Sequence, residues 1–339
     1  MGFLLKTIVA AICSCILLAG GPALAQRGAK GAAPSEEWRA LFQEATTLFF
    51  QGKFDSGVVV AKKALEMAEL ERGPDHPTVA ASLNRLAQLH VAQSQYAAAE
   101  PLIKRGLAIL EKERGAEHPD VASTLNNLAE LYRQQGKFAE AEPLFKRSLA
   151  IREKVLAPEG SQPAFSVNQV ASSVNQLAFS LNGLATIYSE QGQYEAAEPL
   201  YKRAIALVDD SRDRDHPLMA LSLSGLASLH VRRGEYDSAE VLYKRAIAIL
   251  ENSFDRDHPR MAALLQGLAD VYGARDQNMG AEALLKRALE IRLASLGEQH
   301  PAVASTLERL SAVYAKQNKS AEAKQSADRA AAIRSASRK

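Results

Sequence analysis

Five His-Pro dipeptides recur along this chain of 339 residues, and histidine can bind a metal ion or move protons near neutral pH. Their histidines are His76, His118, His216, His258 and His300, which are 42, 98, 42 and 42 residues apart. Ligands of one metal ion must converge within a few ångströms, whereas residues one repeat apart are spread along a stack. We therefore expect the histidines to cap helix starts, with no metal site and no cofactor.

Other catalytic patterns are missing from the sequence. It contains no G-x-S-x-G, H-E-x-x-H or phosphate-binding loop, and its carboxylates recur with the repeat, as residues on a solvated helix face do. Both cysteines, Cys13 and Cys15, lie in the first 25 residues, so the remainder has no thiol and no disulfide. We predict that the protein is not an enzyme.

Residues 1–25 have the pattern of a secretory signal peptide. Lys6 precedes an apolar run from Ile8 to Leu18, and Ala23-Leu24-Ala25 fits an A-x-A cleavage site. The run is too short to span a bilayer comfortably. We predict cleavage after Ala25, a periplasmic or secreted location, no stable membrane insertion afterwards, and a flexible leader over 26–34. An uncleaved anchor is the alternative.

The charge of the chain is nearly balanced, with 41 basic and 39 acidic residues. No domain-sized basic field is therefore available for nucleic acid, and we predict no nucleic-acid partner. Aromatic residues make up only 6% of the chain, while alanine and leucine are plentiful. This composition favours long helices over sheets.

A 42-residue period organises the chain from residue 35 onward. The segment 118–154 matches the segment 216–252 nearly throughout. Within a unit, apolar residues recur at helical spacing, as in Val121, Leu125, Leu128 and Tyr132. A polar break with Gly136 follows, and then a second apolar helix. Each unit therefore reads as two antiparallel helices joined by a tight turn.

The order of small and aromatic residues resembles the tetratricopeptide repeat, and the period and His-Pro starts resemble its kinesin-light-chain type. One unit matches the motif fully, with Ala185, Tyr188, Ala197, Tyr201 and Ala204. The resemblance implies an all-α, right-handed α-solenoid (superhelix) of about seven helix-turn-helix hairpins over residues 35–339. The expected units are 35–75, 76–117, 118–159, 160–215, 216–257, 258–299 and 300–339.

The fourth unit is 14 residues longer than the others because a heptad is written three times in residues 166–185. The apolar spacing continues through the insert, which predicts one long helix from about Pro163 to Gln191. One interpretation is a tolerated expansion. The other is a docking or dimerisation element that uses Phe165, Val167 and Val170, since an exposed apolar stripe often marks a contact surface.

In tetratricopeptide arrays the first helix of each unit lines a concave groove, and the resemblance implies a scaffold that binds an extended peptide of a protein partner there. The position three residues before the small residue holds a polar ladder: Asn84, Asn126, Asn182, Ser224 and Gln266. An amide can both donate to and accept from a peptide backbone. Further groove candidates are Arg85, Gln88, Asn127, Glu130 and Arg133.

Two alternatives remain open at this stage. The asparagines could be solvated or could bridge adjacent helices, without binding a peptide. The protein could also be a self-associating structural protein, a homo-oligomer that uses the long helix near 163–191 or an end of the solenoid.

Overall fold

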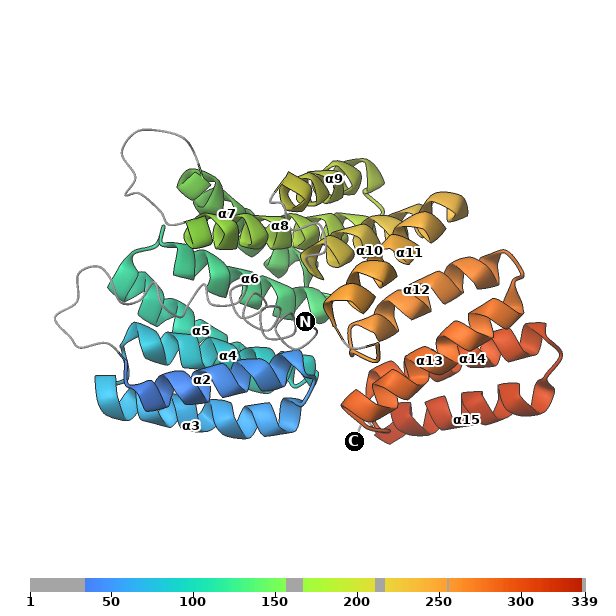
Figure 1. Cartoon of the computed structure of the whole chain (residues 1–339), viewed down its shortest axis with the longest axis horizontal. Helices are drawn as coiled ribbons and strands as arrows, with labels where there is room; N and C mark the ends of the chain where they lie inside the picture. Colours follow the sequence, from blue (N-terminus) through green and yellow to red (C-terminus); the bar gives the residue numbers. More distant parts are fainter. Residues whose placement is uncertain (1–33, 157–166, 211–216, 255, 337–339) are drawn as a thin grey trace, which may run out of the picture. The chain divides into compact units, whose positions relative to one another are not determined.

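The computed structural model describes residues 34–156, 167–210, 217–254 and 256–336. These residues form 14 helices and no strand, and the helices pack as seven consecutive hairpins (Figure 1), which confirms the predicted all-α class. The chain divides into two compact units, Met1–Ser211 and Arg212–Lys339.

Four hairpins belong to the N-terminal unit and three to the C-terminal unit. The helices of the first are α2 (Glu36–Phe50), α3 (Phe54–Arg72), α4 (Pro77–Ala92), α5 (Tyr96–Arg114), α6 (Pro119–Gln134), α7 (Phe138–Leu156), α8 (Val167–Glu190) and α9 (Tyr194–Asp210). Those of the second are α10 (Pro217–Arg232), α11 (Tyr236–Ser253), α12 (Met261–Ala274), α13 (Asn278–Leu296), α14 (Pro301–Lys316) and α15 (Ser320–Ala336).

Three of the His-Pro dipeptides, at His76, His118 and His300, cap helix starts as predicted, and a fourth, at His258, caps the turn that precedes a helix. In four of them the histidine Nδ1 accepts a hydrogen bond, over 3.1–3.2 Å, from the backbone N–H two residues later. These four are His76, His118, His258 and His300. The proline lacks an N–H that the first turn could not have used. His216 lies outside the described residues, and α12 begins at Met261 rather than at Pro259.

The turn inside each hairpin contains one residue in the left-handed conformation. Its φ lies between 57° and 77° in all seven hairpins, at Gly52, Ser94, Gly136, Gly192, Gly234, Asp276 and Asn318. Glycine adopts this conformation without a steric cost, whereas serine does not. The predicted helix stop at Gly136 is confirmed, and the same turn forms where no glycine is present.

In the N-terminal unit the first helices of the hairpins form one layer and the second helices form another. Consecutive first helices contact each other, α2 with α4, α4 with α6 and α6 with α8, and each second helix packs against the first helix that follows it. Consecutive second helices make fewer contacts among the described residues. The row therefore closes more tightly on the side of the first helices, which is its inner side.

Aromatic side chains of two second helices fit against glycines of the next hairpin. Phe145 of α7 is fully buried, and a Cβ added to Gly183 of α8 would lie 2.3 Å from its Cζ. In the C-terminal unit, Tyr243 of α11 meets Gly267 of α12 in the same way, at 2.4 Å. No side chain larger than hydrogen fits at either glycine unless the ring moves.

Helix α8 has 24 residues, whereas α6, the first helix of the preceding hairpin, has 16. At 1.5 Å per residue this difference is about 12 Å. Its predicted beginning, Pro163 to Phe165, lies outside the described residues, while Val167 and Val170 belong to its first turn. Docking or dimerisation through this stripe stays a prediction. Across the described ranges, none of the helices combines the length and apolarity that crossing a bilayer requires.

Candidate functional site

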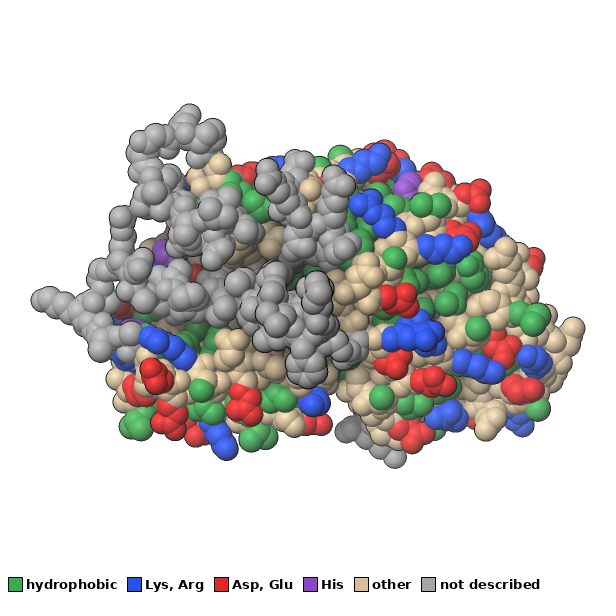
Figure 2. All heavy atoms as spheres, viewed as in Figure 1, with side chains coloured by type: hydrophobic (Ala, Val, Ile, Leu, Met, Phe, Trp, Pro, Cys, Tyr) green, Lys and Arg blue, Asp and Glu red, His purple; other side chains and the backbone are tan. Residues whose placement is uncertain are grey.

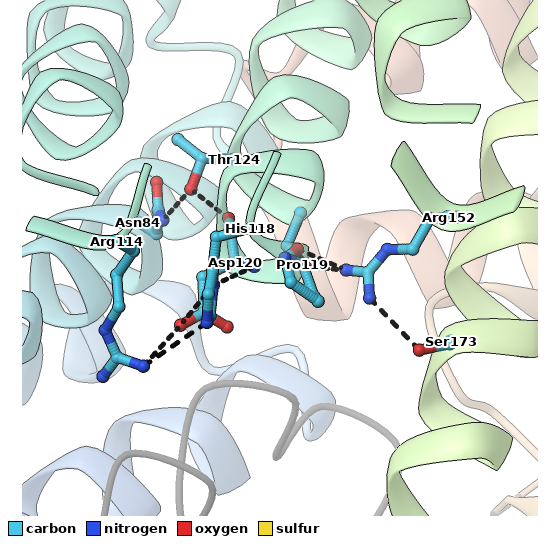
Figure 3. A network of polar contacts seen from close by, with 9 residues as sticks. Asn84, Arg114, His118, Pro119, Asp120, Thr124, Arg152 and Ser173 are labelled. Carbon is cyan, nitrogen blue, oxygen red and sulfur yellow. Dashed lines mark hydrogen bonds and ion pairs between the residues drawn. The ribbon is translucent and has the colours of Figure 1, made fainter. Parts of the chain in front are cut away.

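The predicted polar ladder lies on the first helices, and two of its amides connect one first helix to the next. Asn84 Nδ2 of α4 donates to Thr124 Oγ1 of α6 at 2.7 Å (Figure 3). Asn126 of α6 donates to the Oε1 and main-chain oxygen of Gln176 in α8, at 3.3 and 3.4 Å, and accepts from Ser180 Oγ at 2.9 Å. These two residues therefore bridge adjacent helices, as the alternative interpretation proposed.

The remaining ladder positions differ from one another. Asn182 of α8 is only 4% exposed. In the C-terminal unit, Ser224 Oγ donates to the carbonyl of Leu221 at 2.9 Å, and Gln266 Oε1 accepts from Arg292. A peptide could pair with such groups only by exchanging existing bonds, so peptide binding by the ladder stays a prediction.

A polar network holds the start of α6 against its neighbours (Figure 3). Thr124 Oγ1 donates to the carbonyl of Asp120 at 3.1 Å, and the Asp120 N–H donates to His118 Nδ1 at 3.1 Å. Arg114 Nη1 lies 4.0 Å from Asp120 Oδ2. Burial lowers the pKa of His118, and the Asp120 carboxylate opposes that shift. The neutral ring is the form that can accept the capping bond.

Arg152 of α7 completes this network and was not identified from the sequence. Its Nη2 donates to the carbonyl of Pro119 at 2.7 Å, and its Nη1 donates to Ser173 Oγ of α8 at 3.5 Å. Burial lowers the pKa of Arg152 to about 10. Leu110 and Leu250 occupy the same repeat position. The sequence signal that could have identified Arg152 is a charged residue at a position where two other repeats have leucine.

The second set of predicted groove residues forms a line across α4 and α6. Arg85 Nη1 donates to Gln88 Oε1 at 2.7 Å, and Gln88 Nε2 donates to Asn127 Oδ1 at 3.0 Å. Near the end of α6, Arg133 binds both oxygens of Glu130, at 2.8 and 2.6 Å. The structure therefore brings Arg85, Gln88 and Asn127 together and joins Glu130 with Arg133 as a separate pair.

Arg85 has unusual surroundings for a cation. It is 3% exposed, and its guanidinium lies 5.7 and 5.4 Å from the ring centroids of Phe42 and Phe49 in α2. Burial lowers its pKa to about 10, so it remains charged at neutral pH. Its Nε atom is buried without a hydrogen-bond partner. The two phenylalanines of the first hairpin therefore contact a charge.

The chemistry available at this site is binding chemistry. It offers amide donors and acceptors, a buried cation and aromatic faces, which together suit a peptide. Among the residues with a described placement, no group of three or more His, Cys, Asp or Glu side chains could hold a metal ion. An open hollow of about 580 Å³ between the ends of α5 and α7 contains none of the predicted groove residues.

The exposed surface carries charges of both signs. Figure 2 shows Lys or Arg side chains interspersed with Asp or Glu over the described part of the visible face. Ion pairs along one helix occur on the second helices, such as Lys104 with Glu100 on α5 and Lys146 with Glu142 on α7. Such pairs contribute little to stability. This face offers no single-sign field for a highly charged partner.

The sequence matches the family model described as tetratricopeptide repeat. The match covers residues 39–112, 93–154, 176–252 and 260–336, which is more than half of the chain. None of the curated proteins matches the chain.

Several solved structures are similar to this chain, and those with a TM-score above 0.5 share its fold. BtubC (BKLC) from P. vanneervenii is 22% identical, over 73% of this chain and 92% of that chain, with a TM-score of 0.53. A putative kinesin light chain from Podosopora anserina is 25% identical over 65% and 98%, with a TM-score of 0.47. A Rap protein complexed with competence and sporulation factor is 14% identical over 90% and 77%, with a TM-score of 0.66.

Proposed function

Because this chain belongs to the tetratricopeptide repeat family, we propose that it is a non-catalytic scaffold that binds an extended segment of a partner protein along the first helices of its hairpins. The observation that carries this proposal is the polar line of Arg85, Gln88 and Asn127 on α4 and α6. Amide groups donate and accept at once, so they pair with the backbone of an extended peptide whatever its side chains are.

Structural relatives support a peptide as the ligand. One Rap protein was solved with competence and sporulation factor, and the Rap conjugation regulator of plasmid pLS20 was solved with the Phr* peptide. The second of these is 11% identical to this chain, with a TM-score of 0.66. The fold is thus compatible with a bound peptide, and the residues that would hold one here are our own assignment.

We also propose that the protein acts outside the cytoplasm. The motivation is the signal-peptide pattern of residues 1–25, with cleavage after Ala25. N-terminal sequencing of the protein recovered from the periplasm or the medium measures this. A mature chain that begins at Gln26 is expected, and an intact N-terminus in the cytoplasm would contradict it.

The experiment for the groove compares an inner pair of substitutions with an outer pair. Partners are captured from the cell envelope by cross-linking, the contacted segment is mapped with overlapping synthetic peptides, and its affinity is measured by titration. We expect Gln88→Ala combined with Asn127→Ala to weaken binding about 10- to 30-fold, because two hydrogen bonds of about 1 kcal/mol each are lost.

The matched control changes exposed side chains on the second helices. Lys104→Ala combined with Lys146→Ala removes two ion-pair lysines and is expected to leave the affinity unchanged. If the outer pair weakens binding and the inner pair does not, the peptide binds elsewhere and the proposed groove is wrong.

A further inference from the structure

Arg85 and Arg309 occupy the same place in the repeat, two residues before the small residue of a first helix. Thr46 and Asp270 also share a repeat position, because they are as far apart in the sequence as Arg85 and Arg309. Thr46 and Asp270 belong to the first helix of the preceding hairpin in each case. The two arginines can therefore be compared together with the neighbour that each one faces.

In the C-terminal unit the arginine has a carboxylate partner. Arg309 Nη1 of α14 lies 2.9 Å from Asp270 Oδ1 of α12, and both side chains are partly exposed. Burial raises the pKa of Asp270, and the charge of Arg309 opposes that shift. The cation of one hairpin is thus neutralised by an acid on the hairpin before it.

In the N-terminal unit the corresponding position holds no acid. Thr46 Oγ1 of α2 donates to the carbonyl of Phe42 at 2.7 Å. Arg85 is enclosed by Phe42 and Phe49 and has one hydrogen bond to the neutral amide of Gln88. Its Nε has no hydrogen-bond partner, and neither has that of Arg309, so the polar partners of the two arginines differ in the carboxylate and not at Nε. Within the described part of the chain, no carboxylate forms an ion pair with it.

The contacts of the Arg85 guanidinium therefore do not fully replace the hydration that it loses on burial. A buried cation loses hydration, and two ring faces with one amide oxygen return only part of that free energy. Guanidinium groups bind carboxylates with two parallel hydrogen bonds, and the attraction strengthens where aromatic rings exclude water. A carboxylate brought by a ligand would supply the charge that Asp270 supplies to Arg309.

We propose that Arg85 anchors an Asp or Glu side chain of the peptide bound by the N-terminal unit, in the place that Asp270 fills beside Arg309. This inference rests on the proposed function, and it adds a preference for an acidic residue at one position of the peptide. Phe42 and Phe49 contribute an apolar surround that shields the ion pair from water.

The test selects peptides from a phage-displayed library of random 12-residue sequences, fused through their C-termini so that only side-chain carboxylates are free. The full chain and the Arg309→Met control are expected to enrich peptides with Asp or Glu at one fixed position. Arg85→Met is expected to lose that enrichment. For a selected synthetic peptide, Glu→Gln should weaken binding to the unmodified chain about 30-fold, as for a lost charge-assisted hydrogen bond, and to Arg85→Met less than twofold.

A second variant keeps Arg85 and places a carboxylate of the protein itself beside it. Thr46→Asp supplies the carboxylate found at Asp270, so the acidic preference should disappear while the melting temperature rises. Thr46→Asn is the uncharged control and should keep the preference. Arg85→Met should melt no lower than the unmodified chain, because an apolar side chain of similar size replaces an unpaired buried charge. If Arg85→Met fails to fold, the Thr46 pair still decides the question.

The outcomes separate the two proposals. If the unmodified chain enriches no peptide, the proposed function fails and this inference fails with it. If peptides are enriched without an acidic position, or the acidic position persists in Arg85→Met or Thr46→Asp, the anchor is wrong while groove binding stands.

Discussion

The junction between the second and third hairpins differs from the junction between the third and fourth. In the later junction, the ring of Phe145 fills the space that any side chain at position 183 would need. In the earlier junction, Asn127 occupies the repeat position of Gly183 and accepts a hydrogen bond from Gln88. At this repeat position the later junction is closed by the shape of a ring, whereas the earlier junction is closed by amides that a ligand can also use.

The largest effect should come from breaking the shape-closed junction. Gly183→Ala places a Cβ 2.3 Å from the ring of Phe145, which is fully buried and has little room to move. We expect the free energy of unfolding to fall by about 3 kcal/mol, as for an overpacked core. Equilibrium denaturation in urea measures it. The double variant Phe145→Leu, Gly183→Ala should recover most of the loss, and no recovery would contradict the steric explanation.

The amide bridge at the same junction should matter less. Asn126→Ala removes the hydrogen bonds that join α6 to Ser180 and Gln176 of α8. We expect a loss of about 2 kcal/mol in the free energy of unfolding, because several buried hydrogen bonds between the two helices are lost at once. Asn84→Ala removes one hydrogen bond, to Thr124, and should cost about 1 kcal/mol. Equal losses for both variants would show that the two bridges do not differ as described.

The two junctions should also respond differently to pH. Helix α6 is capped by the neutral ring of His118, whereas α8 has Val174-Asn175 in the place of His-Pro. Burial lowers the pKa of His118, so the folded state prefers the neutral ring. The stabilisation is complete above the unfolded pKa of about 6.5 and declines as the pH falls below it.

Hydrogen exchange at pH 7.5 and 5.5, expressed as protection factors, measures this difference. Protection of the Asp120 amide should fall at the lower pH, by up to about 1 kcal/mol for one lost cap, while amides near Val174 should not change. In His118→Asn the cap does not titrate, so the pH dependence at Asp120 should vanish. Persistence of the dependence in that variant would assign it to another group.

The smallest effect concerns the turns that precede these junctions. Ser94 has a φ of 60° where Gly136 has 73° in the next hairpin. Ser94→Gly should raise the free energy of unfolding by about 0.5 kcal/mol, because the steric cost removed exceeds the extra entropy that glycine loses. Thermal unfolding measures it. Gly136→Ser is the reciprocal change and should destabilise, and a gain in that variant would contradict the argument.

Much of the fold was readable because the period places equivalent residues in register. The caps at His76 and His118 and the turn at Gly136 follow from residue type and position alone. The left-handed conformation of Ser94 was not predicted, because serine does not favour that conformation. The position could have been identified from the 42-residue period, since Ser94 corresponds to Gly136. A periodic chain is thus best read by position first and residue type second.

The candidate site was only partly readable. Helical spacing identifies the inner face of a first helix, but it does not say how consecutive hairpins are rotated against each other. That rotation decides that Asn126 reaches Ser180, and that Arg85 lies between Phe42 and Phe49. The bonds of Arg152 depend in the same way on the neighbouring hairpins.

The extra length of α8 has an evolutionary consequence. Seven residues make nearly two complete turns, so each added heptad rotates the buried side by only about 20°. A tandem duplication in the gene can therefore lengthen such a helix at one end while the other end keeps its packing register. Insertions far from a whole number of turns would rotate apolar side chains toward water, whereas growth by heptads keeps them on the buried side.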